Sequence, residues 1–384
     1  MTTFKKVVGV LHLWLGLSTG LVVFIVSLTG AIFTFQDEIR DATQASWRKV
    51  EVPAQPTEFL LPSRLQAIVK KSHPELKPAF FMYMGPERST VLYSTDKQGE
   101  YFATALNPYT GRELGHLDLH RDFFSIIQDL HMYLLLPVEI GHWVVGISVL
   151  VFVVMLVTGI ILWWPKRKTD RKRSFTIKWG ARWRRVNYDL HNVLGFYAAS
   201  IALILALTGL MMSFEWVMKS VYFVSNAGQD YPTEKTPPTV DTLQVAMATT
   251  QPVADVYYQQ IRRSSPTAKM IFLGLPASPK QPVYSIAYER ALYYYHRDEY
   301  YFHPVSGQLL KSIPHASKSN GQKVADVNYD LHTGQVLGLG GKTLAFLGSL
   351  ISASLPVTGF MVWWGRRKKP KKQRGREMAV AQPA

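Results

Sequence analysis

The chain has 384 residues, of which 47% are hydrophobic, and its formal net charge is +16. It contains no cysteine, which excludes disulfides, thiolate metal sites, iron–sulfur clusters and covalently attached c-type heme. The segments 1–6, 163–190 and 365–384 hold 20 lysines and arginines but only 3 acidic residues. Each of these segments borders an apolar run, so membrane topology explains the charge better than nucleic-acid binding, and we expect no nucleic-acid partner.

Four apolar runs are long enough to cross a bilayer, which takes roughly 20 residues. The positive-inside rule puts the basic segments, and therefore both termini, on the cytoplasmic side. The predicted organisation is a first span in 1–35, an outer domain in 36–139, spans in 140–164 and 191–215 around a basic cytoplasmic loop in 165–190, a second outer domain in 216–337, a last span in 338–364 and a basic tail in 365–384.

The first span carries His12, Gly16 and the pair Thr29-Gly30. A histidine in lipid is a functional hypothesis by default, because an imidazole there needs a polar partner. Heme iron is such a partner, and Gly16 lies one helical turn beyond His12, where it lets a porphyrin or another helix approach. The alternative is an interfacial histidine hydrated by headgroups.

The first outer segment has the composition of a water-soluble domain. We expect a helix over 60–69 and strands over 79–84, 90–93 and 101–106, followed by an Asn-Pro-x-x-Gly turn over 107–114. This order predicts a small unit of one helix and an antiparallel sheet.

The second span is preceded by Asp129-Leu130-His131 and ends in Thr158-Gly159 and Trp163-Trp164. We predict His131 as a second heme ligand; the alternative is a capped loop-to-helix junction with an exposed histidine. His142 opens the span itself. It replaces His131 as a ligand, lines the site, contacts a heme propionate, or is an interfacial residue, and the sequence leaves these possibilities open.

The third and fourth spans repeat this arrangement, which predicts an internal two-fold repeat. The third span carries His191, Gly195 and Thr208-Gly209 at the same spacings as the first. The fourth is preceded by Asp330-Leu331-His332 and ends in Thr358-Gly359 and Trp363-Trp364. Matched histidines favour paired ligation, and we expect His12 with His191 at one depth and His131 with His332 at the other.

The Thr-Gly pairs lie at the far end of each span from its histidine. Because alternate helices run in opposite directions, Thr158-Gly159 and Thr358-Gly359 reach the depth of His12 and His191, and Thr29-Gly30 and Thr208-Gly209 reach the other depth. Glycines there would give a flat macrocycle room, although ordinary helix packing explains them nearly as well.

The second outer segment repeats the first, with a helix over 242–247, strands over 269–273, 283–288 and 300–302, and a His-Pro-x-x-Gly turn over 303–310. Tyr293, Tyr294, Tyr295 and Arg297 form an aromatic, basic cluster in it. Such a cluster suits an aromatic or anionic iron chelate, but an ordinary tyrosine-rich strand edge is the simpler interpretation.

The four spans, the two outer units with their turns, the Asp-Leu-His motifs and the Trp-Trp exits together resemble the PepSY-associated transmembrane family over nearly the whole chain. The family includes iron-regulated inner-membrane proteins and siderophore reductases with two b-type hemes. The resemblance implies an α+β membrane protein: a four-helix transmembrane bundle with an internal two-fold repeat and two PepSY-like periplasmic domains, in the bacterial inner membrane.

The resemblance also implies a function in iron uptake. We expect an oxidoreductase that passes electrons through two hemes b to a periplasmic ferric siderophore or other ferric chelate and so releases ferrous iron. The chain ends in a basic tail, so the donor is expected to be a separate molecule, a quinol or a cytoplasmic flavin reductase. The alternative is a non-enzymatic, membrane-anchored regulator or a docking protein for a peptidase or transporter.

Overall fold

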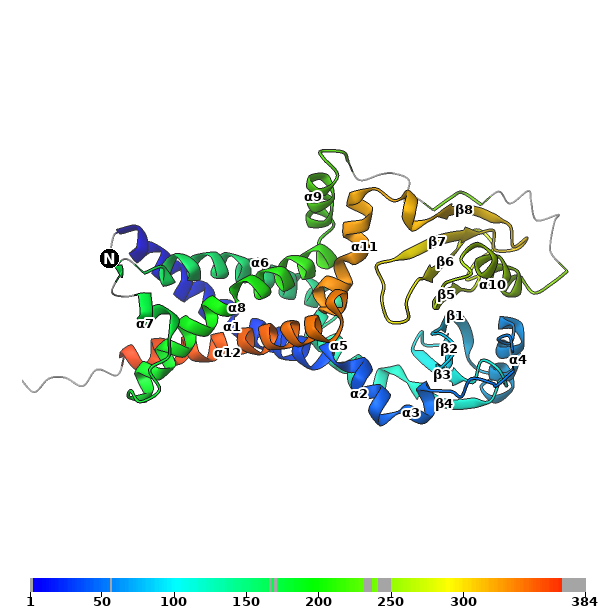
Figure 1. The fold of residues 1–384 in the computed structure, drawn as a ribbon, viewed down its shortest axis with the longest axis horizontal. Helices are drawn as coiled ribbons and strands as arrows, with labels where there is room; N and C mark the ends of the chain where they lie inside the picture. Colours follow the sequence, from blue (N-terminus) through cyan, green and yellow to red (C-terminus); the bar gives the residue numbers. More distant parts are fainter. Residues whose placement is uncertain are drawn as a thin grey trace, which may run out of the picture.

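A computed structural model describes residues 3–55, 57–165, 167–168, 171–230, 237–240 and 250–367. A bundle of long helices forms one end of the molecule and an antiparallel sheet forms the other (Figure 1). The long helices are α1 (Thr3–Thr34), α6 (Val138–Trp163), α8 (Trp183–Ser213) and α12 (Gly338–Arg367). All four are long and apolar enough to cross a membrane, as the sequence predicts.

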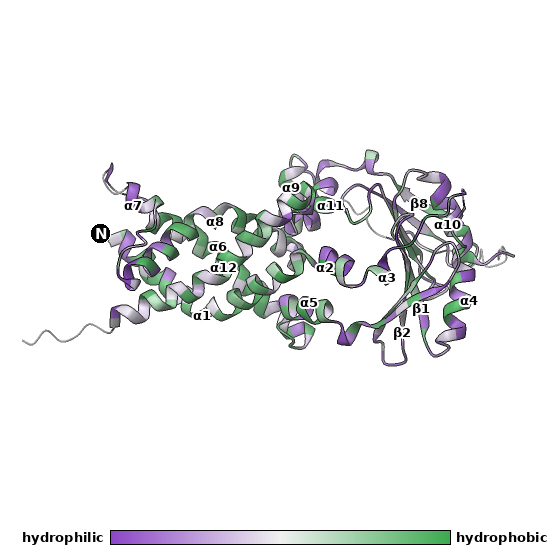
Figure 2. Cartoon of the chain, turned by 60° about the horizontal axis from the view of Figure 1, so that its bottom comes forward, coloured by the Kyte–Doolittle hydropathy of each residue, from purple (hydrophilic) through white to green (hydrophobic). Residues whose placement is uncertain are grey.

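Hydropathy separates the two ends of the molecule. The long helices of the bundle consist largely of hydrophobic residues, whereas the short helices and the sheet carry more polar residues (Figure 2). Large apolar side chains such as Leu21 and Leu339 are well exposed on the bundle. This outward apolar surface is what lipid tails would contact. The N-terminus, the short helix α7 (Arg171–Phe175) and the end of α12 lie together, at the end away from the sheet (Figure 1).

The helix α8 begins at Trp183, eight residues before the predicted span. Its first turns contain Arg184 and Arg185, and arginine is a good helix former, so the helix continues through the basic segment. His191 therefore lies inside the helix, in its third turn, instead of at its first residue.

One eight-stranded sheet forms the other end of the molecule, in the order β4-β3-β2-β1-β5-β6-β7-β8. Its strands are β1 (Lys77–Tyr83), β2 (Thr90–Thr95), β3 (Tyr101–Leu106), β4 (Glu113–Asp118), β5 (Met270–Gly274), β6 (Val283–Tyr288), β7 (Arg297–Phe302) and β8 (Leu309–Ile313). We predicted two units of three strands. The structure instead has four strands in each half, and antiparallel pairing of β1 with β5 joins the halves into one sheet.

Two helices cover the face of this sheet that is turned away from the bundle: α4 (Pro62–Ser72) and α10 (Val253–Ser264) (Figure 2). The core between them and the sheet includes the fully buried Leu65, Phe81, Tyr257 and Phe302, and it runs across both halves. The predicted helix over 60–69 corresponds to α4. The one predicted over 242–247 lies outside the described residues, and α10 takes the place expected for it.

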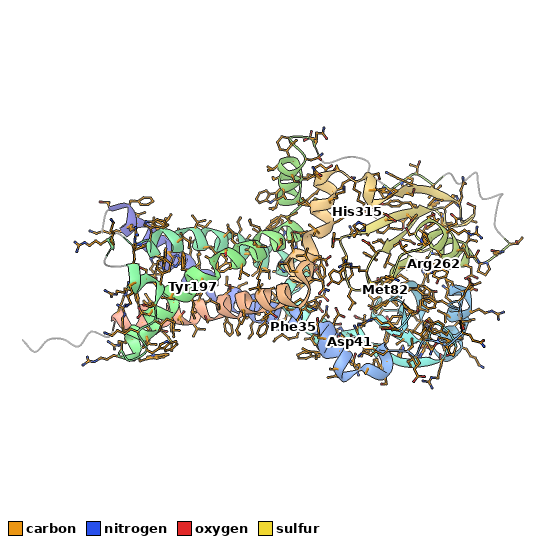
Figure 3. All side chains as sticks on the ribbon, viewed as in Figure 1. Phe35, Asp41, Met82, Tyr197, Arg262 and His315 are labelled. Carbon is orange, nitrogen blue, oxygen red and sulfur yellow. The ribbon has the colours of Figure 1, made fainter. Side chains whose placement is uncertain are left out.

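Short helices connect the bundle with the sheet: α2 (Gln36–Thr43), α3 (Ala45–Arg48), α5 (Phe123–Tyr133), α9 (Glu215–Ser225) and α11 (Asn320–His332). Phe35 and Asp41 mark this connection in Figure 3. Asp41 pairs with Arg48 and Arg88, and Arg40 pairs with Asp122. These half-buried ion pairs fasten the sheet to the helices that carry the histidines; Asp122 itself is the N-cap of α5, just before its first residue.

Candidate functional site

Four histidines form two pairs inside the helical part of the molecule. His12 of α1 lies against His191 of α8, with ring centroids 6.5 Å apart and ring planes at 79°. His131 of α5 lies against His332 of α11, with centroids 6.1 Å apart and planes at 62°. We call these the far pair and the sheet-side pair. Each pair takes one imidazole from each half of the chain.

Every one of these imidazoles is hydrogen-bonded through Nδ1 to a threonine of a Thr-Gly pair. The far pair uses threonines near the ends of α6 and α12: Nδ1 of His12 is 2.9 Å from Oγ1 of Thr158, and Nδ1 of His191 is 3.0 Å from Oγ1 of Thr358. Within each half, a histidine thus reaches the threonine of an antiparallel neighbour.

The sheet-side pair repeats this contact with threonines of α1 and α8. Nδ1 of His131 is 3.2 Å from Oγ1 of Thr29 and 2.9 Å from the carbonyl oxygen of Val26. Nδ1 of His332 is 2.9 Å from Oγ1 of Thr208. The four Thr-Gly pairs therefore meet the four histidines at the depths that the antiparallel order predicts.

The threonines also determine which ring nitrogen carries the proton. Each hydroxyl donates its single proton to a carbonyl in the preceding turn of its own helix, as Thr158 does to Val154 (2.9 Å) and Thr208 does to Ile204 (2.7 Å). Toward the histidine the hydroxyl can then only accept, so Nδ1 must donate. In a neutral imidazole this leaves Nε2 unprotonated, with its lone pair free for a metal.

Each glycine of a Thr-Gly pair leaves space for the imidazole that its threonine holds. A Cβ atom added to Gly30 would come within 3.1 Å of Cε1 of His131, and one added to Gly359 would come within 3.1 Å of Cε1 of His191. The corresponding distances are 3.3 Å for Gly209 and 3.5 Å for Gly159. The glycines thus accommodate imidazole rings; contact with a heme remains a prediction.

The sheet-side histidines are held neutral by their surroundings. Burial, followed by the neighbouring His131, lowers the pKa of His332 to about 4. Burial also lowers the pKa of His131. Both rings are therefore uncharged at neutral pH, which is the form that binds metals.

The distance between the ring centroids of each pair is compatible with two imidazoles that share one metal ion. Metal–imidazole bonds are about 2.0–2.1 Å long, so two rings bound on opposite sides of one ion have centroids about 6 Å apart. The observed separations of 6.5 and 6.1 Å agree with this value. With Nδ1 already bonded in each ring, the arrangement suits two axial imidazoles of a heme iron.

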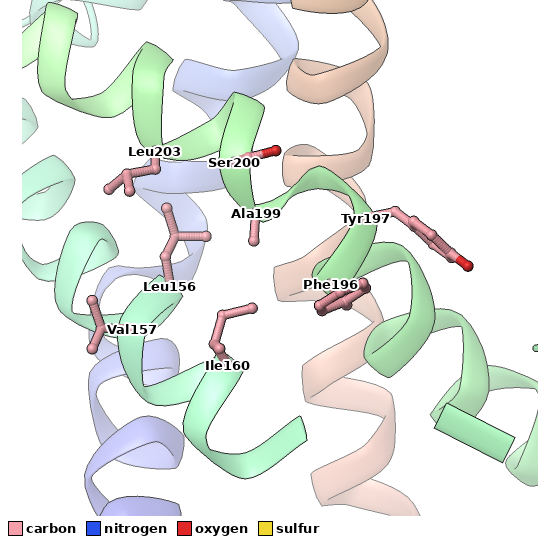
Figure 4. A pocket seen from close by; sticks show the side chains of 8 residues that line it. All are labelled: Leu156, Val157, Ile160, Phe196, Tyr197, Ala199, Ser200 and Leu203. Carbon is pink, nitrogen blue, oxygen red and sulfur yellow. The ribbon is translucent and has the colours of Figure 1, made fainter. Parts of the chain in front are cut away.

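An apolar cavity of about 470 Å³ lies between α6 and α8, within the size range of cofactor sites (Figure 4). Leu156, Val157 and Ile160 line it from α6, and Phe196 and Leu203 line it from α8. No histidine of the far pair and no residue of the Thr158-Gly159 pair lines it, so the cavity is separate from the far pair.

Two asparagines that the sequence analysis missed support the second half of the site. Asn187 donates to the carbonyl oxygen of Thr358 at 3.0 Å, and Asn328 donates to that of Thr208 at 3.0 Å. Each stands four residues before a paired histidine, in the hexapeptide Val-Asn-Tyr-Asp-Leu-His, which occurs at 186–191 and again at 327–332. This exact duplication was the signal in the sequence that would have identified them.

The aspartates of these motifs fasten neighbouring segments. The carboxylate of Asp330 accepts from the backbone N–H groups of Tyr294 and Tyr295, at 2.9 and 3.0 Å. Asp189, in the first copy of the hexapeptide, pairs with Arg185 at 2.8 Å. Asp330 thus ties the tyrosine cluster of the second half to the helix that carries His332.

The remaining predicted residues have other neighbours. His142 packs against the rings of Trp143 and Phe214, and its counterpart Lys342 pairs with Glu38 at 2.7 Å. Gly16 faces Met155, and Gly195 faces Leu355. Neither glycine is brought against an imidazole.

The tyrosine cluster is largely engaged within the fold. Tyr294 packs against Tyr288 and Tyr329. Arg297 pairs with Asp326 at 2.8 Å and is mostly buried. The guanidinium that we expected to meet an anionic chelate is therefore already neutralised by the protein.

Comparison with known proteins supports the resemblance. The model of the PepSY-associated TM region matches residues 10–366, which is nearly the whole chain. No curated protein matches it.

Proposed function

Because this chain belongs to the PepSY-associated TM family, we propose that it is a multi-pass membrane oxidoreductase that carries electrons through two b-type hemes. The observation that supports this proposal is the pair of cross-half histidine contacts at two depths, with Nδ1 bonded and Nε2 free in all four rings. Four generic interfacial histidines would have no reason to share one hydrogen-bond pattern.

His12 and His191 would hold one heme, and His131 and His332 the other. A heme with two imidazole ligands supplies one-electron transfer and leaves no open position for oxygen or substrate. The protein's part is to keep four imidazoles neutral, in one tautomer and in fixed orientations. The threonines do this through Nδ1, and Asn187 and Asn328 fasten two of the threonine-bearing segments.

The proposed direction runs from the basic end of the bundle to the sheet end. By the positive-inside rule we expect α7 and both termini on the cytoplasmic side and the sheet on the outer side, which in a Gram-negative cell is the periplasm. A separate donor, a quinol or a flavin reductase, would meet the far pair, and a ferric siderophore or similar chelate would accept electrons near the sheet. Hard oxygen chelates hold ferrous iron more weakly than ferric iron, so reduction would release the metal.

The test is a reduced-minus-oxidised absorption spectrum of the purified chain, with heme counted per polypeptide. We expect sharp b-type bands and two hemes. A folded but colourless protein would overturn the proposal and favour the alternative, a membrane-anchored regulator or docking protein.

Single variants assign the ligands. His12→Ala and His191→Ala should each reduce the heme count from two toward one, and His131→Ala and His332→Ala should do the same for the other heme. His142→Ala is the matched control, because its ring packs against Trp143 and Phe214, and it should keep both hemes. Unchanged heme in both His12→Ala and His191→Ala would remove the far pair from the site.

A further inference from the structure

A second cluster of metal-binding side chains lies in the sheet, and the proposed electron transfer does not use it. His73, Glu113 and His116 place one potential ligand atom each within 4.8 Å of one another. His73 directly follows the last residue of α4, and the other two lie on β4. Because β4 is an edge strand and the three residues are only half buried, an ion from solution can reach them.

A β-bulge brings Glu113 and His116 to the same face of the sheet. Residues three apart on a regular strand point to opposite faces. Here His116 pairs with Thr104 and Glu113 pairs with Leu106, although the intervening residues number two on β4 and one on β3. The extra residue on β4 reverses the alternation, as bulges beside functional sites often do. Both side chains therefore point to the face that α4 covers.

The three side chains already touch one another. Nε2 of His73 is 3.0 Å from Oε1 of Glu113, and the rings of His73 and His116 are stacked with centroids 3.9 Å apart. Because the nitrogen lone pairs lie in the ring planes, one of the two half-buried rings must turn about its Cβ–Cγ bond for both to bind one ion. Ligand atoms around an ion with bonds of about 2.0–2.1 Å lie roughly 3 to 3.5 Å apart. The His73–Glu113 contact meets this spacing, and an ion would take the place of the proton between the two groups.

Outer partners fix two of the three side chains. The hydroxyl of Ser72 donates to Oε2 of Glu113 at 2.8 Å, and Nδ1 of His116 is 3.0 Å from Oγ1 of Thr104. The ring of Phe102 stacks on the other face of the His116 ring. Such bonds orient metal-binding imidazoles and carboxylates in known sites.

The second half of the sheet shows that the fold does not need these residues. The same bulge occurs where β7 pairs with β8. By register and by the matching turns, Ser265, Leu309 and Ser312 stand in place of His73, Glu113 and His116. Ser265 there bonds to Tyr300 and Asp298 instead. The architecture is common to both halves, and the ligand set belongs to the first half alone.

We propose that His73, Glu113 and His116 bind a divalent transition-metal ion, separate from the proposed hemes. Two imidazoles and one carboxylate suit Zn²⁺, Fe²⁺ or Cu²⁺, whereas Mg²⁺ and Ca²⁺ prefer oxygen ligands alone. Three protein ligands leave coordination positions for water, so the site stays open to exchange at the sheet edge.

The experiment is a calorimetric titration of the full-length chain in detergent with Zn²⁺, using a purification tag without histidine. We expect one zinc site per chain, and Mg²⁺ should not compete for it. His73→Ala and His116→Ala should each weaken zinc binding at least tenfold. The control His120→Ala removes an exposed histidine of the same half and should bind zinc as the wild type does.

X-ray absorption at the zinc edge tests the wild type itself, in case a variant fails to fold. Two imidazole ligands per zinc are expected, and a shell of oxygen atoms alone would overturn the proposal. Unchanged zinc affinity in both His73→Ala and His116→Ala would also overturn it. Heme content should be the same in these variants as in the wild type, so failure of either proposal can be told apart from failure of the other.

Discussion

The two halves of the chain hold their imidazoles in the same way and differ in what surrounds them. In both halves a histidine of the first long helix bonds to a Thr-Gly pair of the second, and a histidine of a connecting helix bonds to a Thr-Gly pair of the first. Among the residues that the structure describes, the asparagines bonded to the threonine carbonyls occur only in the second half, and the cluster of His73, Glu113 and His116 occurs only in the first.

This difference separates the contacts that the histidine pairs require in both halves from the parts of the structure that can vary between the halves. Each pair takes one ring from each half, so a change in the threonine that holds one histidine alters a site that both halves share. The threonine–histidine contacts are accordingly the same in both halves. The sheet and the connecting segments are not shared in this way, and there the halves have diverged. The predictions below test this contrast, from the largest expected effect to the smallest.

The buried ion pairs of the second half should matter most for stability. Nζ of Lys318 is 2.7 Å from Glu299 and 2.6 Å from Asp326, and all three are almost completely buried. Lys318→Met would leave two buried carboxylates without this partner, which costs about 3–5 kcal/mol in comparable cases. Arg121 is an exposed cation of the first half, next to Asp122, which stands in register with Lys318, so Arg121→Met is the control and should leave thermal unfolding in detergent unchanged. Equal effects of the two variants would contradict the contrast.

The same cluster predicts how stability depends on pH. Burial opposes ionisation of Glu299, but Lys318 and Arg297 outweigh it and lower the pKa to about 2, from 4.5. A lowered carboxylate pKa contributes stability that is fully present above pH 4.5 and is lost as the pH falls toward 2. The contribution is on the order of 3 kcal/mol. Unfolding measured between pH 7 and 3 should therefore show an acid-dependent loss that is smaller in Glu299→Gln; equal slopes would refute this origin.

Substitution of Asn187 or Asn328 tests whether the hydrogen bond of each asparagine affects only the histidine pair beside it. Asn187→Ala and Asn328→Ala each remove one hydrogen bond, worth about 1 kcal/mol. The first half has Val8 and Ile127 at the corresponding positions. Under the proposed function, Asn187→Ala should shift the midpoint potential of only the heme proposed at the far pair, and Asn328→Ala that of only the heme proposed at the sheet-side pair, in a redox titration. Equal shifts of both hemes in either variant would show that the support is not local.

The glycines offer the finest comparison. A methyl group at Gly30 or Gly359 would crowd an imidazole at 3.1 Å, whereas one at Gly159 meets His12 at an ordinary 3.5 Å. Gly159→Ala should therefore keep its heme and gain about 0.5–1 kcal/mol from the helix. In Gly30→Ala and Gly359→Ala, crowding of the imidazole should cancel this gain in helix stability. It should also broaden the absorption bands of the proposed heme. Three identical spectra would show that the space beside the ring is not needed.

Much of the helical part could be predicted from the sequence, because long apolar runs and repeated spacings have few structural solutions. The four spans and the meeting of His12 with His191 and of His131 with His332 follow from antiparallel order alone. The room for a macrocycle that we expected beside the Thr-Gly pairs stays a prediction, and the contact of these pairs with imidazole rings was not foreseen. The direction of the threonine hydrogen bonds, which shows that the pairs hold imidazoles, appears only in three dimensions.

The sheet was less predictable, for two reasons. No local pattern indicates that β1 pairs with β5, since that contact joins segments far apart in the chain. The strand β4 was missed because it follows a turn directly and contains Gly115. The His73 cluster depends on that strand and on its bulge, which inverts the ordinary alternation. The duplicated hexapeptide that contains Asn187, in contrast, could have been recognised in the sequence.

The pairing of β1 with β5 also bears on how the protein is made. Its two partners are separated by about 190 residues, which a ribosome adds in roughly 10 to 40 s. During that time two spans must insert while the inner edge of β1, near Phe80 and Met82, has no strand beside it. A newly made first half thus leaves this edge of β1 unpaired until β5 arrives, and an unpaired strand edge is prone to pair with another chain.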